Sequence, residues 1–284
     1  MNISAAQARE HLTSCRQAVN DALAGLRPFS PSQALDEAIA YVLFPGGKRL
    51  RPALCLAVGE LFRPRSRSLL QVSMAVELLH TASLVFDDLP CMDDATDRHG
   101  KRAVHLVYGT GLAVLCGHSL VSLAMQIPAQ SDMEDRAVRN IVAEFARCVG
   151  PAGMAGGQAD DLRGQDNVDD DGARNVAMRK TGYLFGAAAY CGAVAGEASP
   201  MQAEALRRFG IEVGTAYQMA DDLRDYRRED KPDRSVNTAA ALGIRETHDA
   251  FHRQLVLARS CLDGFSSNRT LTGFLDLIEG FCDG

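Results

Sequence analysis

The chain has 284 residues, of which 46% are hydrophobic and 23% are charged. This composition is typical of a globular protein, argues against disorder, and gives ample length for a buried core. The net charge of -6 argues against a general nucleic-acid binder, because counterion release requires a basic surface. The eight cysteines form no CxxC pair and no zinc spacing, so we expect free thiols and a cytoplasmic protein.

Helical spacing dominates the chain from its beginning. Residues 12–26 carry apolar side chains at three- and four-residue steps, which predicts an amphipathic helix. Charged residues interrupt residues 1–26, where a secretory signal would need an apolar run, so we expect no targeting segment.

Further helices are predicted along the rest of the chain, separated by clusters of turn residues. They cover residues 69–89, 141–149, 178–194, 203–226 and 250–262. The most apolar stretch, 184–196, is shorter than the roughly 20 residues of a bilayer span, so we predict a buried helix and no transmembrane segment. The sequence shows no repeat and no long linker, which predicts about ten helices in a single domain over residues 1–284.

An acidic cluster ends the predicted helix 69–89. Asp87, Asp88 and Asp93 follow an apolar run, and carboxylates so close to one another are costly unless a cation lies among them. On an unbroken helix Asp87 and Asp93 would lie on different faces. Pro90 predicts that the helix kinks or ends between them, which would allow Asp93 to return to the side of Asp87.

A second acidic cluster lies within the predicted helix 203–226. Asp221 and Asp225 share one helix face at positions i and i+4. Gln218 joins that face, and Asp222 follows Asp221. Each cluster alone could be a solvated acidic helix end. Two such clusters on apolar helices favour Mg²⁺, which takes carboxylate oxygens and bridges substrate phosphates.

Basic residues provide candidate ligands for those phosphates. The stretch 46–52, GGKRLRP, places cations directly after a glycine pair, although a polar turn flanked by helix cations has the same appearance. Residues 98–102 follow the first acidic cluster closely enough to reach the same metals. Lys180 and Thr181 begin an apolar helix. His80 lies about two turns before the first acidic cluster on the same helix face, where a lone histidine can also be a satisfied core residue.

These features together resemble the trans-polyprenyl diphosphate synthases. The family's two aspartate-rich motifs, DDxxxxD and DDxxD, are matched by residues 87–93 and 221–225. The other motifs follow in the family's order as GGKRLRP at 46–52, GMAGGQADDL at 153–162 and KTG at 180–182. The amino-acid sequences of the aspartate-rich segments are most similar to those of bacterial geranylgeranyl diphosphate synthases.

The resemblance implies an all-α isoprenoid-synthase bundle around a central apolar cavity, and a homodimer. The implied reaction condenses isopentenyl diphosphate head-to-tail with dimethylallyl, geranyl or farnesyl diphosphate, after Mg²⁺-assisted ionisation to an allylic carbocation. The implied Mg²⁺ ligands are Asp87, Asp93, Asp221 and Asp225. The implied catalytic residues are Asp87, Asp88, Asp93, Lys180, Asp221, Asp222 and Asp225. No protein nucleophile is required.

The same resemblance assigns residues to the two substrates. Isopentenyl diphosphate would be bound by Lys48, Arg51 and His80. The allylic diphosphate would be bound by Arg98, Lys180, Thr181 and Gln218. Two further substrate-binding candidates, His99 and Lys231, depart from the family pattern.

The departures concern cations. His99 stands where the family usually has the second of two adjacent arginines. Where the family usually has two lysines after DDxxD, this chain has Lys231, with Arg234 as a substitute. The ending, residues 278–284, lacks basic residues that could close the site.

Product length is predicted from the residues one helical turn before Asp87. Ser83 and Ala82 are both small, whereas in the resembling family a large aromatic residue at this level stops growth at the fifteen-carbon farnesyl product. We therefore expect the twenty-carbon geranylgeranyl product, with growth stopped deeper in the cavity, near residues 112–123.

Alternative functions remain at this stage. A farnesyl or other short-chain diphosphate synthase differs only in product length. A class I terpene cyclase shares the fold, but it usually keeps one DDxxD motif and has no use for GGKRLRP. A catalytically silent subunit would be marked by a lost motif aspartate; none is lost here, although His99 and the short segment at Lys231 keep this reading open.

Overall fold

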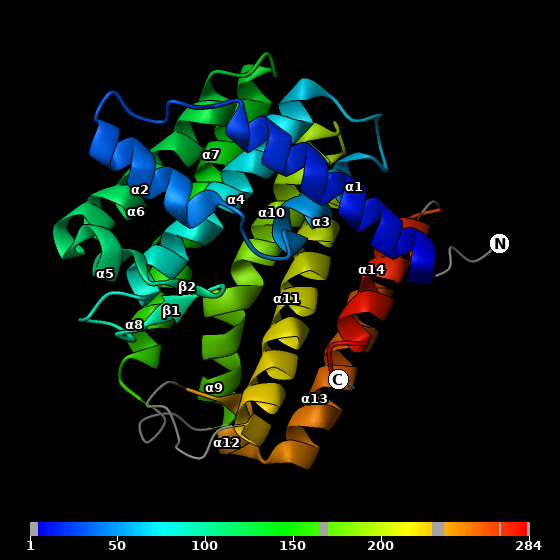
Figure 1. Ribbon diagram of the computed structural model, residues 1–284. Helices are drawn as coiled ribbons and strands as arrows, with labels where there is room; N and C mark the ends of the chain where they lie inside the picture. The colour runs from blue at the N-terminus through cyan, green and yellow to red at the C-terminus, as the bar shows by residue number, and fades with distance from the viewer. Residues whose placement is uncertain (1–4, 165–169, 229–235, 267, 283–284) are drawn as a thin grey trace.

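The computed structural model describes residues 5–164, 170–228, 236–266 and 268–282, and these are predominantly helical (Figure 1). The helices are α1 (Ala5–Ala24), α2 (Gln33–Leu43), α3 (Leu50–Gly59), α4 (Arg67–Asp87), α5 (Val104–Tyr108), α6 (Thr110–Ala129), α7 (Asp135–Val149), α8 (Met154–Asp161), α9 (Asp170–Ala177), the π-helical turn η2 (Met178–Gly182), α10 (Tyr183–Ala195), α11 (Pro200–Arg228), α12 (Thr238–Leu242), α13 (Ile244–Ser260) and α14 (Arg269–Glu279). The predicted all-α fold is confirmed.

Helix α10 lies at the centre of the bundle, packed against α3, α4, α7 and α11 (Figure 1). It is buried along most of its length, because its alanines and glycines let neighbouring helices approach closely. At Gly192 a Cβ atom would lie 2.2 Å from the backbone oxygen of Cys55 in α3, so this contact requires glycine. The predicted buried helix at 184–196 is thus the central helix of the fold.

The five helices predicted at 69–89, 141–149, 178–194, 203–226 and 250–262 correspond to α4, α7, η2 with α10, α11 and α13. Apart from shifted helix ends, two local features were not predicted. Residues 178–182 form a π-helical turn, which periodicity does not distinguish from an α-helix. Strands β1 (Asp97–Arg98) and β2 (Lys101–Arg102) form a hairpin, whose turn residues His99 and Gly100 both have positive φ angles.

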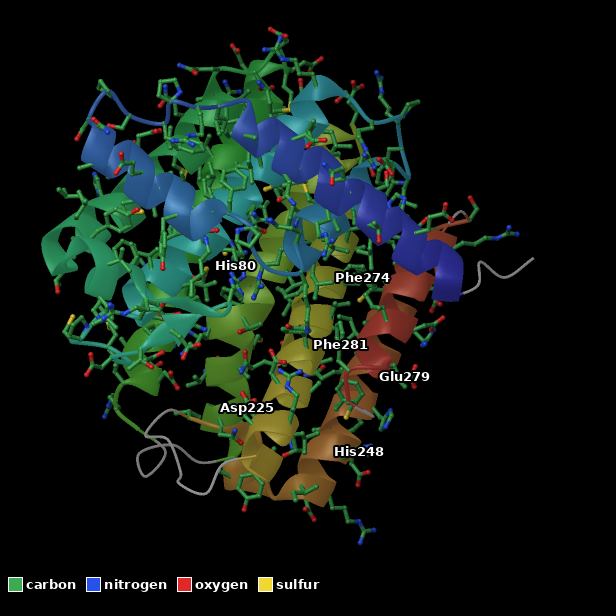
Figure 2. The ribbon with its side chains drawn as sticks, viewed as in Figure 1. His80, Asp225, His248, Phe274, Glu279 and Phe281 are labelled. Atoms are coloured by element: carbon green, nitrogen blue, oxygen red, sulfur yellow. The ribbon has the colours of Figure 1, made fainter. Side chains whose placement is uncertain are left out.

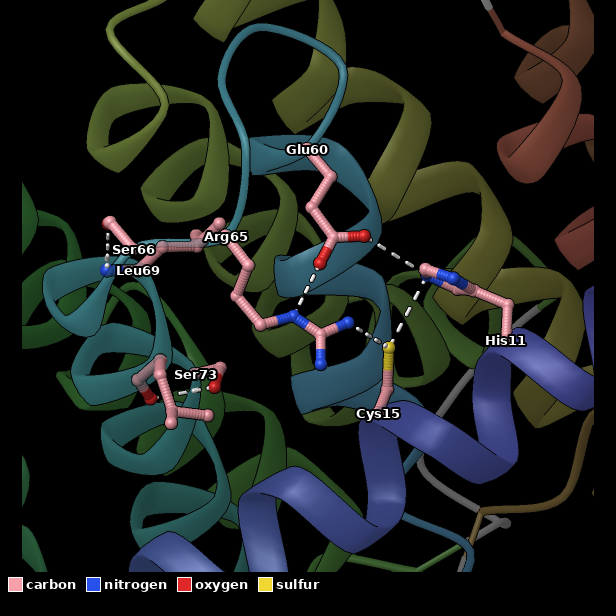
Figure 3. Close-up of polar contacts among 8 residues, drawn as sticks. His11, Cys15, Glu60, Arg65, Ser66, Leu69 and Ser73 are labelled. Atoms are coloured by element: carbon pink, nitrogen blue, oxygen red, sulfur yellow. Dashed lines mark hydrogen bonds and ion pairs between the residues drawn. The ribbon is translucent and has the colours of Figure 1, made fainter.

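Helix α1 crosses the bundle and is held on it by a polar cluster (Figure 3). Cys15 is fully buried, and its Sγ lies 3.3 Å from His11 Nε2 and 3.3 Å from Arg65 Nη2. Arg65 also donates to Glu60, just after α3, and His11 lies 3.5 Å from the same carboxylate. Burial raises the pKa of Cys15 to about 11, so this thiol is protonated at neutral pH.

Two helices, α4 and α6, are long and apolar enough to span a membrane by length and composition alone. Of the most apolar window, 67% is buried within the fold in α4 but only 33% in α6. Helix α4 is therefore a core helix of the bundle. The apolar stretch 184–196 corresponds to the shorter helix α10, and α6 contains residues 112–123, which are predicted to stop product growth.

Candidate active site

The first acidic cluster forms where α4 ends. The helix stops at Asp87, three residues before Pro90, and the chain turns back so that the Asp93 amide donates to the Asp87 carbonyl oxygen at 2.9 Å. The backbone of Asp93 therefore returns to Asp87 as the proline predicts. Asp87 is half-buried, whereas Asp93 is exposed.

The β1–β2 hairpin brings a cation to this cluster. Arg98 Nε donates to Asp88 Oδ1 at 3.0 Å, and its terminal nitrogen bonds the same oxygen. Asp88 is only 2% exposed, so its carboxylate is committed to Arg98. Asp88 thereby fixes Arg98 beside the more accessible carboxylates of Asp87 and Asp93.

Among the neighbouring charged groups, Lys180 has the largest effect on the pKa of Asp87. Burial raises the pKa of Asp87 to about 6, while Lys180 acts against this shift and Asp93 adds to it. Burial tends to lower the pKa of Lys180, but Asp161, Asp87 and Asp93 together hold it above its ordinary value. The Lys180 ammonium donates to Asp161 Oδ2 at 2.7 Å.

The carboxylates of the second acidic cluster differ in burial. Asp222 is 5% exposed and accepts hydrogen bonds from Gln218 Nε2 at 2.7 Å and from the amide and hydroxyl of Thr238 at 2.8 and 2.7 Å. It therefore anchors α12 to α11. Asp221 forms an ion pair with Arg224 one turn along the helix, and Asp225 is exposed.

The π-helical turn η2 joins the two clusters. It carries Lys180 toward Asp87, while the next residue, Thr181, donates its hydroxyl hydrogen to Gln218 Oε1 at 2.6 Å. Gln218 in turn donates to Asp222. A π-turn redirects successive side chains relative to an α-helix, and such turns occur often at functional sites.

The cations of the GGKRLRP segment reach the same region from α3. Arg51 Nη1 lies 3.3 Å from His80 Nε2, and the Arg51 guanidinium stacks 4.5 Å from the centre of the Phe185 ring. Burial first, and then Arg51, place the pKa of His80 well below its ordinary value, so this imidazole is neutral at pH 7. The structure thus brings Arg51 and His80 together. Figure 2 shows His80 among the side chains of the bundle.

Lys48 has aromatic neighbours that the sequence did not reveal. Its ammonium lies 4.1 Å from the centre of the Phe281 ring and 5.7 Å from that of Tyr217. Phe281 follows α14 and packs edge-on against Tyr217 of α11 (Figure 2). The Phe281 ring therefore lies over the Lys48 ammonium, and no local sequence signal could have indicated this long-range contact.

His99 lies on the other side of the glycine pair. A Cβ atom at Gly47 would be 3.1 Å from the His99 ring, so the hairpin turn touches the GGKRLRP segment. Burial and the positive charges of Arg98 and Arg49 lower the pKa of His99. Arg98 and His99 also line a pocket between α2, α4 and the hairpin, together with Arg49 and Asp88.

The chain-length candidates lie on α4 beneath the acidic cluster. Ala82 is 1% exposed, and half-buried Ser83 donates its hydroxyl hydrogen to the His80 carbonyl oxygen at 2.8 Å. One turn above Ala82, Phe86 packs on α6, where a Cβ at Gly117 would lie 2.7 Å from its ring. Helix α6, which contains the predicted floor at 112–123, is thus the neighbour of this face.

Lys231 and its possible substitute Arg234 lie outside the described residues. Among the described ones, Asp161 is a further candidate that sequence reasoning missed. It is 3% exposed and binds both Lys180 and, at 2.7 Å, the amide of Val236. The motif GMAGGQADDL contains it, but only the fold shows which of its two aspartates turns inward.

Comparisons with known proteins identify the family of the chain. The family model described as polyprenyl synthetase matches residues 32–236. The chain is 32% identical to geranylgeranyl pyrophosphate synthase 4 of Arabidopsis thaliana, over 94% of this chain and 77% of the relative. It is also 32% identical to the heterodimeric geranylgeranyl pyrophosphate synthase large subunit 2 of the same plant, over 91% and 73%. The crystal structure of an FPP/GFPP synthase from Zymomonas mobilis superposes with a TM-score of 0.88 and 29% identity, over 98% of this chain and 99% of that one.

Proposed function

The chain belongs to the polyprenyl synthetase family, and we propose that it is a short-chain trans-prenyltransferase that joins isopentenyl diphosphate to an allylic diphosphate. One observation carries this proposal: Lys180 stands beside Asp87 and Asp93, while its neighbour Thr181 is bonded to the Asp221 cluster through Gln218. Two acidic clusters and a half-buried cation in one region fit a metal-bridged diphosphate better than any other ligand.

The chemistry of the acidic residues suits Mg²⁺, although among the described residues no three acidic, histidine or cysteine side chains form a group that could hold an ion by itself. Carboxylate oxygens are the ligands it prefers, and within the described residues no side chain donates a hydrogen bond to the Asp87 carboxylate. The raised pKa of half-buried Asp87 indicates an acid whose negative charge is not fully compensated by protein cations. Asp87, Asp93, Asp221 and Asp225 would hold the ions. Bound Mg²⁺ would neutralise the diphosphate leaving group.

The protein's own residues hold and shield the allylic substrate. Lys180 and Arg98 bind the diphosphate oxygens on which charge develops as the carbon–oxygen bond breaks. Asp161 and Asp88 orient these two cations. Small and apolar side chains of α4 and α10 exclude water, so that the allylic carbocation is not hydrolysed.

Isopentenyl diphosphate binds through Lys48, Arg51 and neutral His80. Its double bond attacks the carbocation, a carbon–carbon bond forms, and the released diphosphate accepts the proton that is lost. These reaction steps need no protein nucleophile. The geranylgeranyl product is supported by the small side chains of Ala82 and Ser83, which leave no aromatic wall one turn below Asp87.

The decisive experiment is product analysis by chain length. The purified chain is incubated with Mg²⁺, isopentenyl diphosphate and dimethylallyl, geranyl or farnesyl diphosphate in separate reactions. A linear twenty-carbon diphosphate supports the proposal. A fifteen-carbon product would assign a farnesyl diphosphate synthase, and a cyclic hydrocarbon a terpene cyclase. Absence of turnover by the well-folded chain would instead favour a silent subunit of a heteromeric synthase.

A further inference from the structure

Arg49 stands between Lys48 and Arg51, the two cations assigned to isopentenyl diphosphate, but it faces a different environment. The residue is 3% exposed, and its backbone adopts the left-handed conformation with φ of 55°. This conformation is unfavourable for a residue with a side chain, so other contacts must maintain it. Because its side chain is almost fully buried, we do not assign Arg49 to substrate binding.

Those contacts connect three helices. Arg49 Nε donates to Asn20 Oδ1 of α1 at 3.0 Å, and its terminal nitrogens donate to the Leu43 carbonyl oxygen at the end of α2 and to Glu77 of α4. A Cβ atom at Gly46 would lie 2.1 Å from Arg49 Nη2. The first glycine of GGKRLRP is therefore required because the guanidinium folds back over it.

Glu77 is the centre of this arrangement. It is 2% exposed, and while Oε1 bonds Arg49, Oε2 is buried without a hydrogen-bond partner. Arg51 also has an unused hydrogen-bond donor, because its Nε is buried and has no partner. Burial raises the pKa of Glu77, and Arg49 and then Arg51 act against this shift. Arg51 is thus the second cation that the buried carboxylate attracts.

We propose that Arg49 is a positioning residue that neutralises Glu77 and so leaves Arg51 directed at His80 and available to isopentenyl diphosphate. Without Arg49, the buried carboxylate would have no partner, a state that proteins avoid strongly. The Arg51 guanidinium would turn to Glu77 and be lost to the substrate. This inference rests on the proposed function.

The test compares Arg49→Met with the double variant Arg49→Met/Glu77→Leu. The single variant should raise both the Kd of isopentenyl diphosphate, measured by calorimetry, and its KM about tenfold or more, because one charge-assisted contact is lost. The KM of the allylic substrate should change less than about twofold. The double variant should bind isopentenyl diphosphate nearly as wild type does, because no buried carboxylate remains to attract Arg51.

Arg207→Met is the matched control. Arg207 also pairs with a buried glutamate, Glu144, at 3.2 Å, but it lies about 20 Å along α11 from Asp221. It should lower thermal stability without changing the Kd of isopentenyl diphosphate.

Two results would overturn the role of Arg49: an unchanged Kd in the single variant, or a double variant that binds as poorly as the single one. If Arg49→Met does not fold, the double variant decides alone, since near-normal binding supports the proposal and a tenfold loss refutes it. A wild-type protein without turnover would refute the proposed reaction. The calorimetric comparison would still test Arg49.

Discussion

At the scale of single residues, Asp87 and Asp221 differ in how their charges are balanced. Burial and neighbouring carboxylates raise the pKa of Asp87, whereas Asp221 has an ion-pair partner in Arg224. Asp87 is therefore destabilising in the metal-free fold, whereas Asp221 is partly compensated. Both would still be needed for the metal-bound diphosphate.

We expect Asp87→Ala or Asp221→Ala to reduce kcat about 1,000-fold or more, because each removes a metal ligand. The melting temperature without Mg²⁺ should hold in both variants and rise most clearly for Asp87→Ala, where repulsion is relieved. Steady-state kinetics and calorimetry measure the two effects. Asp276→Ala on α14 is the control, and near-normal turnover in either test variant would contradict the metal assignment.

Asp222 gives a pH dependence of stability. Burial raises its pKa to about 6 in the folded protein, although Thr238 and Gln218 act against the shift. An unfolded aspartate titrates near 3.9, so the folded state binds this proton more tightly, and the contribution of Asp222 to stability increases as pH falls from above 6 toward about 4. The melting temperature of the wild type minus that of Asp222→Asn should therefore be larger at pH 5 than at pH 8. An identical difference in melting temperature at both pH values would show that Asp222 is not buried as an acid.

His99 is the residue that departs most clearly from the family pattern, in which an arginine is usual. Its lowered pKa makes the ring mostly neutral at pH 7, so it is a weaker ligand for a phosphate than arginine. We expect wild type to have a high KM for isopentenyl diphosphate, and His99→Arg to lower it about tenfold, as a charge-assisted contact would. Arg102→Lys in the same hairpin is the control. An unchanged KM in His99→Arg would place residue 99 outside the binding site.

The sequence motifs named candidate residues for the chemistry, but they did not identify the residues that orient these candidates. The two aspartate motifs and Pro90 predicted the return of Asp93 to Asp87. Nothing local predicted that Asp161 binds Lys180, or that Phe281 covers Lys48, because these contacts form only when distant helices meet.

At the scale of helices and strands, hydrophobic periodicity located the long helices but not their irregular ends. Helix α4 ends at Asp87 rather than at 89, and in the π-turn η2 the neighbouring residues Lys180 and Thr181 bond different partners. The short β1–β2 hairpin was not predicted, since four strand residues carry no alternating pattern. These irregular parts are where the candidate site is built.

The α4–α6 pair carries the prediction of product length. Ala82→Phe would add a ring to a buried position of α4, one turn below Phe86, where the fourth isoprene unit is expected. The main product should shift from twenty to fifteen carbons while the first condensation is retained, as chromatography of the products would show. Ser73→Phe, farther along α4, is the control for disturbed packing. If wild type already stops at fifteen carbons, or if Ala82→Phe leaves length unchanged, the wall is wrongly assigned.

At the scale of the whole molecule, α5 and α6 present an apolar face that the described part of this chain does not cover. Leu106 and Val107 of α5 are 40% and 44% exposed, and Val114 and Leu115 of α6 are 42% and 54% exposed. From the sequence, a homodimer is implied only by the family resemblance. The exposed face gives it a physical basis, because adjoining apolar patches of this kind mark interfaces.

We predict that a second copy of the chain covers this face. Light scattering should give twice the chain mass of 30.6 kDa, and Leu115→Glu should give a monomer, because it buries an unpaired charge at the contact. Activity should decrease when the dimer is lost, because α6 packs on α4, which carries Asp87. Val256→Glu is the matched control: Val256 on α13 is 66% exposed, so the same charge there should leave the dimer intact. A monomeric wild type, or a dimer that survives Leu115→Glu, would mean that the α5–α6 face does not join two copies.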